Sequence, residues 1–494
     1  MRRPAPIALA LACALAAHAE AQIDFSASSQ AACVLDSGGG PVEALRCLFD
    51  EGPTPATCDG ERVPPRMIKL VGRALGLLDR AEHKNRPKTS KRLVKRAARV
   101  LKRAGRITRR AANRHRNPIN GECANDLSRT IEDAREAALA TVKPDKPRAR
   151  QKLAVILTTD FTNTGSYSTI TLDKPRAVRK DLAKTHSDAV GRVFQDRLYV
   201  VNRLHQDNIQ VIKPGSGQSL AACSIGNGSN PQDIAFASKD KAYVSRLTDG
   251  IVTIVDPTVP RTCSGFERRR IDLRRFSDAD GSPEPGRMLI VGNRLYVALL
   301  RLDQNRLFVP AARGLLAVID TTTDTLIDVD PETSEIDAIE LAAENPFGMA
   351  YDAASGKIWV WETGSFFVVG DGGIEAVDPT TNRSQGLIAR EEDLGGTVTA
   401  AAPYTAARAF AVVADTDFQN RLVAFSPTTG DLLDTLRSAP EYFPDVAVNN
   451  RGEVWLADRT VAEPGIRIFD AESGQVVAGP INVGLPPFVI LFVQ

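Results

Sequence analysis

The spacing of apolar residues changes once along the chain, near residue 150, from a period of three to four to a period of two. Before that point, apolar residues recur at helical intervals in three stretches, from Ile68 to Leu78, from Leu93 to Ala111 and from Leu127 to Ala138. Proline or glycine precedes each stretch. The pattern predicts three amphipathic helices in a small bundle within residues 22–147, with a core that is thin because many of its apolar positions are alanine.

After a charged, proline-interrupted linker at residues 143–147, short runs of Val, Ile, Tyr and Phe alternate with polar residues, which is typical of β-strands. One strand type recurs with starts separated by 44, 53, 63, 51 and 45 residues. Its copies begin at Arg197, Lys241, Arg294, Lys357, Arg408 and Glu453. A second strand that ends in a turn with aspartate follows most copies. Repeats of this length with four strands each predict the blades of a β-propeller.

The two ends of the repeat region complement each other. Residues 153–159 and 167–173 have the patterns of the second and third strands of a blade, but no inner strand precedes them. Residues 486–493 have the inner-strand pattern. If both ends share one blade, the ring closes and no sheet edge is exposed. We therefore predict an all-β seven-bladed propeller over residues 148–494, closed by the C-terminal strand and preceded by a small disulfide-linked α-helical domain.

The blades resemble those of the YVTN-repeat propellers, a bacterial family with Tyr-Val-x-Asn in one strand and Val-x-Val-Ile-Asp in the next. Residues 199–202 (Tyr-Val-Val-Asn) are the closest copy, and the resemblance covers roughly residues 152–494. It implies the propeller fold. Relatives of that family include haem-binding, lactone-hydrolysing and quinone-dependent enzymes as well as many members without a known activity, so the resemblance selects no activity.

The first residues predict export. Two arginines precede an apolar run from Ile7 to Ala17, and small residues follow at positions 19 and 21, which is the layout of a signal peptide over residues 1–21. The run is too short to span a bilayer, and no later segment has the 18 or more apolar residues of a membrane helix. We expect a secreted or periplasmic protein that works as a monomer.

Removal of this leader leaves an even number of cysteines, which predicts disulfide bonds in an oxidising compartment. They are Cys33, Cys47, Cys58, Cys123, Cys223 and Cys263. We expect each domain to pair its own cysteines, Cys223 with Cys263 in the propeller and, in the helical domain, Cys33 with Cys47 and Cys58 with Cys123. No pair of cysteines has the spacing of a zinc site.

Charge is distributed unevenly. Residues 62–116 hold 20 Lys and Arg against two acids, whereas the rest of the chain holds 42 basic and 58 acidic residues. Nearly every position off the apolar stripe of the second predicted helix is basic: Lys91, Arg92, Lys95, Arg96, Arg99, Lys102, Arg103, Arg106, Arg109 and Arg110. Acids that would pair with them one turn away are absent, so the helix repels itself unless something anionic lies against it.

Two partners for this basic face remain open. One is the acidic propeller of the same chain, and the other is an external polyanion such as an acidic polysaccharide, lipid phosphates or nucleic acid. No aromatic residue interleaves with the basic ones, which argues against stacking on single-stranded nucleic acid. The apolar stripe is largely Ala and Val, which argues against insertion into a membrane.

Motifs that carry catalysis or cofactors are missing from the sequence. It has no haem-attaching Cys-x-x-Cys-His, no His-Glu-x-x-His and no Gly-x-Ser-x-Gly, so we predict no catalytic residue and no cofactor. Asp278, Asp280 and Glu284 surround a glycine turn and resemble part of a calcium loop. The bidentate glutamate that completes such a loop is missing, so calcium and a solvated turn both stay open.

The connections between second and third strands differ most in length, and those at residues 301–313 and 363–372 are long. In a propeller these connections lie on one face beside the channel mouth, where ligands commonly bind. They and a later loop contain the candidate binding residues Arg301, Asp303, Phe308, Phe366, Phe367, Asp415, Asp417 and Phe418. Alternatively, these loops pack on one another and cover the channel.

We predict a non-catalytic binding or scaffold protein that recognises a protein, a glycan or another polymer. Two alternatives remain. A lactonase-like or other propeller hydrolase would need acids that converge at the channel. An envelope structural protein would use the propeller as a spacer and the basic helices as an anchor.

Overall fold

The structure is a computed structural model that describes residues 58, 63–82, 87–112, 119–140, 151–258, 262–365 and 368–493. The chain divides into two compact units, Met1–Pro147 and Arg148–Gln494.

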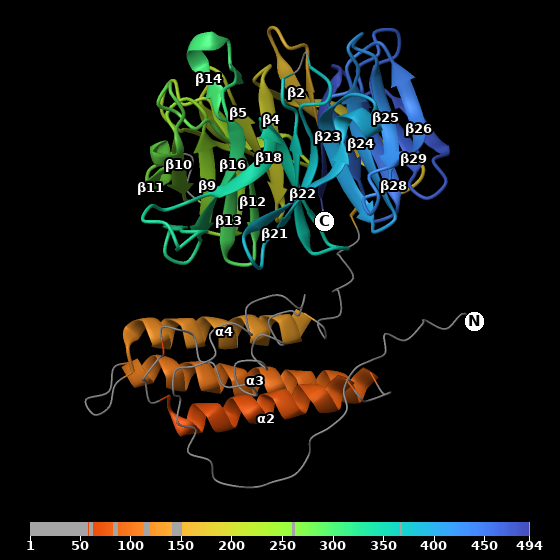
Figure 1. Cartoon of the computed structure of the whole chain (residues 1–494). Coiled ribbons are helices and arrows are strands. Elements are labelled where there is room, and N and C mark those ends of the chain that lie inside the picture. The colour runs from red at the N-terminus through yellow and green to blue at the C-terminus, as the bar shows by residue number, and fades with distance from the viewer. Residues whose placement is uncertain are drawn as a thin grey trace. The chain divides into compact units, whose positions relative to one another are not determined.

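Three helices make up most of the described part of the first unit (Figure 1). They are α2 (Pro65–Glu82), α3 (Pro87–Ala112) and α4 (Gly121–Ala140), and α3 packs against both of the others. Proline suits the first position of α2 and α3, because the N–H that it lacks has no acceptor inside the helix there. The predicted helices are confirmed.

The core of this helical unit contains one apolar stripe from each helix. Val71, Leu101 and Ile131 are fully buried, and alanine occupies many of the remaining core positions. A disulfide between Cys58 and Cys123 joins the segment before α2 to the first turn of α4 across 65 residues. By restricting the unfolded chain, such a bridge contributes about 4 kcal/mol. This predicted pair is confirmed, whereas Cys33 and Cys47 lie outside the described residues.

The second unit is a ring of seven antiparallel sheets, which confirms the predicted propeller (Figure 1). The inner strands of the seven blades, in chain order, are β4 (Ala189–Phe194), β8 (Pro231–Ser238), β12 (Pro285–Val291), β19 (Pro346–Asp352), β23 (Thr397–Thr405), β27 (Asp445–Val448) and β31 (Pro487–Val493). The second strands are β1 (Leu153–Thr159), β5 (Arg197–Asn202), β9 (Lys241–Arg246), β13 (Arg294–Leu299), β20 (Lys357–Glu362), β24 (Arg408–Ala414) and β28 (Glu453–Asp458).

The two outer positions of each blade complete the sheets. The third strands are β2 (Gly165–Thr171), β6 (Asn208–Lys213), β10 (Ile251–Val255), β16 (Arg313–Asp320), β21 (Gly373–Asp378), β25 (Asn420–Phe425) and β29 (Gly465–Asp470). The outermost strands are β3 (Val178–Thr185), β7 (Gln218–Ser224), β11 (Glu267–Asp272), β17 (Thr325–Ile327) with β18 (Ile339–Glu344), β22 (Arg383–Arg390), β26 (Leu432–Ala439) and β30 (Val476–Ile481).

The ring closes through the first blade, as predicted. Strand β31 pairs with β1, with Ile490 opposite Ile156, so this blade combines strands from both ends of the propeller. Each inner strand also contacts the inner strands of both neighbouring blades, and β31 lies between β27 and β4. Every blade around the ring therefore has its inner strand, and the first blade obtains it from the C-terminal end of the propeller.

The tyrosine of the repeated strand joins neighbouring blades. Tyr243 of β9 is fully buried, and its hydroxyl donates to Asp324 Oδ1 in the next blade at 2.5 Å. Tyr296 of β13 donates in the same way to Asn382 Oδ1 at 2.8 Å. The basic residue that opens the strand binds the same turn, as Arg294 does at Pro379 O. The Arg/Lys-x-Tyr pattern is therefore an interblade connection.

The predicted pair of propeller cysteines is also confirmed. A disulfide joins Cys223 on outer strand β7 to Cys263 in the connection between β10 and β11 of the following blade.

No helix among the described residues is long and apolar enough to cross a membrane.

Candidate functional site

The candidate site lies on one end of the ring, which we call the mouth face. Neighbouring strands of each blade are antiparallel. Two sets of connections therefore lie at the same end of the ring: those from a second to a third strand, and those from an outermost strand to the inner strand of the next blade. The first set comprises residues 160–164, 203–207, 247–250, 300–312, 363–372, 415–419 and 459–464. The start of β1 and the end of β31 lie at the opposite end of the ring.

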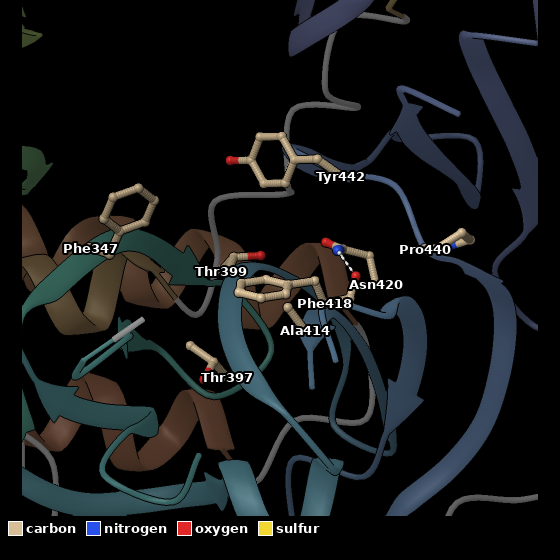
Figure 2. A pocket seen from close by; sticks show the side chains of 8 residues that line it. All are labelled: Phe347, Thr397, Thr399, Ala414, Phe418, Asn420, Pro440 and Tyr442. Atoms are coloured by element: carbon tan, nitrogen blue, oxygen red, sulfur yellow. Dashed lines mark hydrogen bonds between the residues drawn. The ribbon is translucent and has the colours of Figure 1, made fainter. Parts of the chain in front are cut away.

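A pocket of about 260 Å³ opens on the mouth face between the blades that begin with β19, β23 and β27. Its lining consists of Phe347, Thr397, Thr399, Ala414, Phe418, Asn420, Pro440 and Tyr442. Figure 2 shows the rings of Phe347, Phe418 and Tyr442 on different sides of the opening. These residues are 36%, 59% and 40% exposed, so their rings present apolar surface to solvent around one opening.

Three separate segments of the propeller supply the three rings. Phe347 follows Pro346 at the start of β19, Phe418 lies between β24 and β25, and Tyr442 lies between β26 and β27. Small side chains at Thr397 and Ala414 leave the space between them open. The pocket therefore exists only when three neighbouring blades are in place.

The loop that presents Phe418 is fixed by its own hydrogen bonds. Asp415 Oδ1 accepts from the backbone N–H groups of Asp417 and Gln419, at 3.0 and 2.9 Å. Asn420 Nδ2 donates to Phe418 O at 3.1 Å, and Asn420 Oδ1 accepts from Phe443 N at 3.3 Å. The second contact joins this loop to the segment that contains Tyr442. The pocket is thus ordered before any ligand binds.

The same backbone conformation recurs around the mouth face. Large apolar residues adopt the left-handed region that favours glycine in the connections of four blades: Phe161 (φ 62°), Leu204 (φ 36°), Leu307 (φ 61°), Phe308 (φ 58°) and Phe418 (φ 59°). All five are exposed. A left-handed residue other than glycine costs on the order of 1 kcal/mol, so these exposed apolar residues are candidates for a binding surface.

Aromatic contacts extend from Tyr442 of the pocket to the first blade. The ring of Phe161 lies 6.5 Å from that of Tyr442 and 5.0 Å from that of Phe488. The guanidinium of Arg459 lies over Phe161 at 4.1 Å and donates to Thr159 O and Pro486 O. A cation therefore borders the aromatic cluster without an acidic partner bonded to it among the described residues.

Four charged side chains come from the inner strands. Arg192 of β4 forms a two-point ion pair with Asp233 of β8, at 2.9 and 2.7 Å. This guanidinium lowers the pKa of Asp233 although burial acts in the opposite direction. Burial raises the pKa of Asp445 on β27 to about 7. Arg287 of β12 forms no ion pair with a described residue, and burial lowers its pKa.

Two of these charges, Asp445 and Arg287, act on Tyr442 of the pocket. The protein around the ring raises the pKa of the Tyr442 hydroxyl although 40% of the residue is exposed; Asp445 adds to this effect, whereas Arg203, Arg459 and Arg287 oppose it. The hydroxyl therefore stays protonated at neutral pH and can donate a hydrogen bond. The site combines three aromatic rings with a cationic border on the axial side.

The structure distributes the predicted binding residues over several places. Phe418 lines the pocket, Asp415 holds its loop, and Asp417 is exposed beside it. Arg301, Asp303 and Phe308 do not line it.

Those three residues belong to the long excursion at residues 300–312, which forms a small hairpin of β14 (Leu302–Asp303) and β15 (Val309–Pro310). There Asp303 caps the short helical turn that follows it. Phe366 and Phe367 lie outside the described residues.

Sequence reasoning missed Phe347 and Tyr442. It considered only the connections between second and third strands, whereas both residues lie next to connections that enter an inner strand. Their signal was an aromatic residue close to the start of an inner strand: Phe347 is the second residue of β19, and Tyr442 lies three residues before β27.

The candidate calcium residues have hydrogen-bonding roles in their own loop. Asp280 Oδ2 accepts from Gln304 N at 2.7 Å, and Asp278 Oδ1 accepts from Asp280 N at 3.1 Å. Glu284 accepts from Leu302 N at 2.9 Å and from the Gln304 side chain. Within the described ranges, no three His, Cys, Asp or Glu side chains gather in a way that could hold a metal ion.

Glu284 has a counterpart in the next blade. Glu391 accepts from Gly370 N and Val398 N, at 3.0 and 2.9 Å. Burial raises the pKa of each of these carboxyls to about 7. Each long connection of the mouth face is thus anchored by one buried glutamate.

A comparison with protein families finds none that the chain matches, and a comparison with curated proteins finds no relative. The resemblance to YVTN propellers therefore rests on the strand repeats alone. Solved propellers are similar in fold.

A protein from Lactobacillus plantarum has 14% identity and a TM-score of 0.47, over 70% of this chain and 100% of that one. A streptogramin B lyase has 10% identity and a TM-score of 0.42, over 63% and 92%. BamB from Moraxella catarrhalis has 14% identity and a TM-score of 0.34, over 61% and 78%. At such identities and TM-scores these similarities carry no inference about function.

Proposed function

We propose that this protein is an exported binding module whose propeller holds a partner protein over the mouth face, with an apolar side chain of the partner inserted into the pocket. The observation that carries the proposal is the pocket formed by Phe347, Phe418 and Tyr442. Exposed aromatic residues around a preformed cavity are the usual anchors of a protein interface.

The polar groups of the pocket favour binding over catalysis. Thr397 Oγ1 donates to Val368 O at 3.4 Å, and Thr399 Oγ1 donates to Val412 O at 3.5 Å. Both hydrogen bonds of the Asn420 side chain are formed with backbone groups. Tyr442 is protonated at neutral pH, as an ordinary tyrosine is, and its raised pKa makes it a still poorer base. The lining thus provides apolar surface and orientation rather than a general base.

A hydrolase remains the second candidate, and the axial carboxylates are the residues it would use. Both oxygens of Asp233 are occupied, by Arg192 and by Met288 N. Asp445 accepts from Ile490 N at 2.8 Å. These bonds favour a role in holding the inner strands together.

Export is supported by the disulfides of both units, because such bonds persist in oxidising compartments. The predicted leader at residues 1–21 agrees with this compartment.

Arg459 and Arg287 near the pocket favour a partner whose apolar anchor is flanked by a carboxylate.

The test places a photo-crosslinking residue at the pocket of the full chain in its native host. Phe418→p-benzoylphenylalanine should yield one crosslinked partner, and the yield should fall when Phe347→Ala and Tyr442→Ala are added. Leu433→p-benzoylphenylalanine is the matched control, because Leu433 is similarly exposed on outer strand β26 of the same blade. Equal crosslinking from both positions contradicts the proposal, and so does a crosslinking yield that the two alanine substitutions leave unchanged.

The hydrolase is tested on a panel of lactones. Turnover by the wild type that is lost in Asp445→Asn would favour the hydrolase.

A further inference from the structure

One side of helix α3 is a continuous row of cations, which we call the cationic stripe. Its members are exposed: Arg92, Lys95, Arg96, Arg99, Lys102, Arg103, Arg106, Arg109 and Arg110. At 3.6 residues per turn, they fall within an arc of about 140°, and they extend over about 27 Å of helix. The side chain of Lys91, at the start of the row, lies outside the described residues.

The described residues provide no acidic partner for the stripe. None of its nine side chains forms an ion pair with another described residue. The one hydrogen bond from the stripe runs from Arg99 Nε to the backbone oxygen of Lys95. On α2, Arg66, Lys69, Arg73 and Arg80 are exposed as well. Like charges one turn apart destabilise a helix, so this row is kept at a cost in stability.

The opposite side of α3 is already occupied. Val94, Ala97, Leu101 and Ala104 are buried in the core between α2 and α4. No apolar face of α3 is therefore left to enter the acyl region of a bilayer. Neither α2 nor α3 contains an aromatic residue that could stack on a base.

We propose that the cationic stripe is the docking site of a linear anionic polysaccharide. A row of nine cations over this length cannot be neutralised by one small anion, whereas a polymer with regularly spaced carboxylate or sulfate groups lies along it. The polymer need not enter a groove, because all nine cations are exposed on one side of the helix. Arginine predominates in the stripe, and its planar guanidinium binds carboxylate and sulfate oxygens at two points.

Two features favour this polymer over other polyanions. The disulfides and the proposed export place the chain outside the cytosol, away from most nucleic acid. The propeller of the same chain is a poorer partner, because most of its carboxylates serve its own ion pairs and turns, as Asp458, Asp378 and Asp320 do. The inference rests on export and does not depend on the pocket.

The test uses the full mature chain, residues 22–494, with the sulfated polysaccharide heparin and with polygalacturonate. The stripe variant carries Arg96→Gln, Arg99→Gln, Arg103→Gln and Arg106→Gln. The control carries Lys184→Gln, Lys213→Gln, Lys239→Gln and Arg383→Gln, which remove the same charge from exposed positions of the propeller. Glutamine has nearly the helix propensity of arginine, so the stripe variant should keep its fold. Thermal unfolding and mapping of the Cys58–Cys123 disulfide check that the variant is folded.

We expect both polysaccharides to bind the wild type and the control alike, and the stripe variant to lose at least about tenfold in affinity. The plot of log affinity against log salt concentration should become less steep by about three to four in that variant, because binding releases fewer counterions when four cationic contacts are lost. Equal loss in the control overturns the proposal. So does tighter binding to duplex DNA, tighter binding to vesicles of anionic lipid, or no binding by the intact chain, which would show that the propeller already covers the stripe.

Discussion

Arginine side chains are abundant in both units, but their surroundings differ. In the propeller, Arg437 and Arg467 both bond to Asp458, whose side chain is fully buried. Arg192 pairs with Asp233 in the same way. On α3, the nine cations of the stripe have no such partner in the described structure. Paired charges hold strands together, whereas an unpaired row of one sign stabilises only a complex with something else.

The cores differ as well. Buried rings such as Trp359, Trp455 and Tyr296 pack between the blades of the propeller. The helical unit has a core of three short apolar stripes in which alanine is frequent, supplemented by one disulfide. A fully buried aromatic side chain contributes more than a buried alanine, so the propeller should be the more stable unit. The following experiments test this contrast.

The largest effect is expected from opening the ring. Deletion of residues 484–494 removes β31 and leaves β1 with an unpaired edge facing the axis. We expect an insoluble protein, or loss of the cooperative unfolding transition of the propeller in calorimetry. Truncated protein that melts as the full chain does would show that the shared blade is not needed.

The disulfides should matter unequally. Cys58→Ser with Cys123→Ser removes about 4 kcal/mol from a unit with a thin core, and we expect its helices to unfold. Cys223→Ser with Cys263→Ser removes a contribution of similar size from the propeller, which should stay folded at room temperature. Hydrogen exchange of both units in each variant measures the difference. Protection of α2 to α4 that is unchanged without the bridge would refute the expected weakness of the helical core.

A buried carboxyl makes the propeller sensitive to pH. Burial, with the charge of Glu375 beside it, raises the pKa of Glu362 to about 10, while Arg313 acts weakly in the opposite direction. The folded pKa lies above the ordinary value of 4.5, so this group contributes stability that is complete below pH 4.5 and is lost as pH rises toward 10.

Glu362→Gln should therefore unfold at the same temperature as the wild type near pH 4 and at a higher temperature near pH 9. Glu332→Gln, at an exposed position, is the control and should change neither value. A wild type whose thermal unfolding does not shift between these pH values would show that Glu362 is ionised and paired in the fold.

The smallest effect concerns salt. Raising ionic strength from about 0.05 to about 0.5 M screens repulsion between exposed charges. We expect the helical unit to gain stability because the cationic stripe repels itself less, and the propeller, whose charges are largely paired, to change little. Two transitions followed by circular dichroism over the salt series decide this, and equal shifts in both units would contradict the contrast.

Much of the fold could be predicted from local patterns. The helices of the first unit follow from apolar residues at three- and four-residue intervals, and the blades follow from the repeated strands. Closure of the ring and the pairs Cys58–Cys123 and Cys223–Cys263 followed from matching segments within each unit. The candidate site was predicted less well. Phe418 was identified, but Phe347 and Tyr442 were not.

What the sequence by itself determined is therefore the set of elements, their order and the charge of each helix face, because periodicity and composition are local properties. Only the tertiary structure decided which residues form the pocket, since its three rings come from separate blades that meet through the angle between neighbouring sheets. The structure also decided that Phe418 points outward, because its left-handed backbone is fixed by Asp415 and Asn420. No spacing of residues along the chain encodes such contacts between blades.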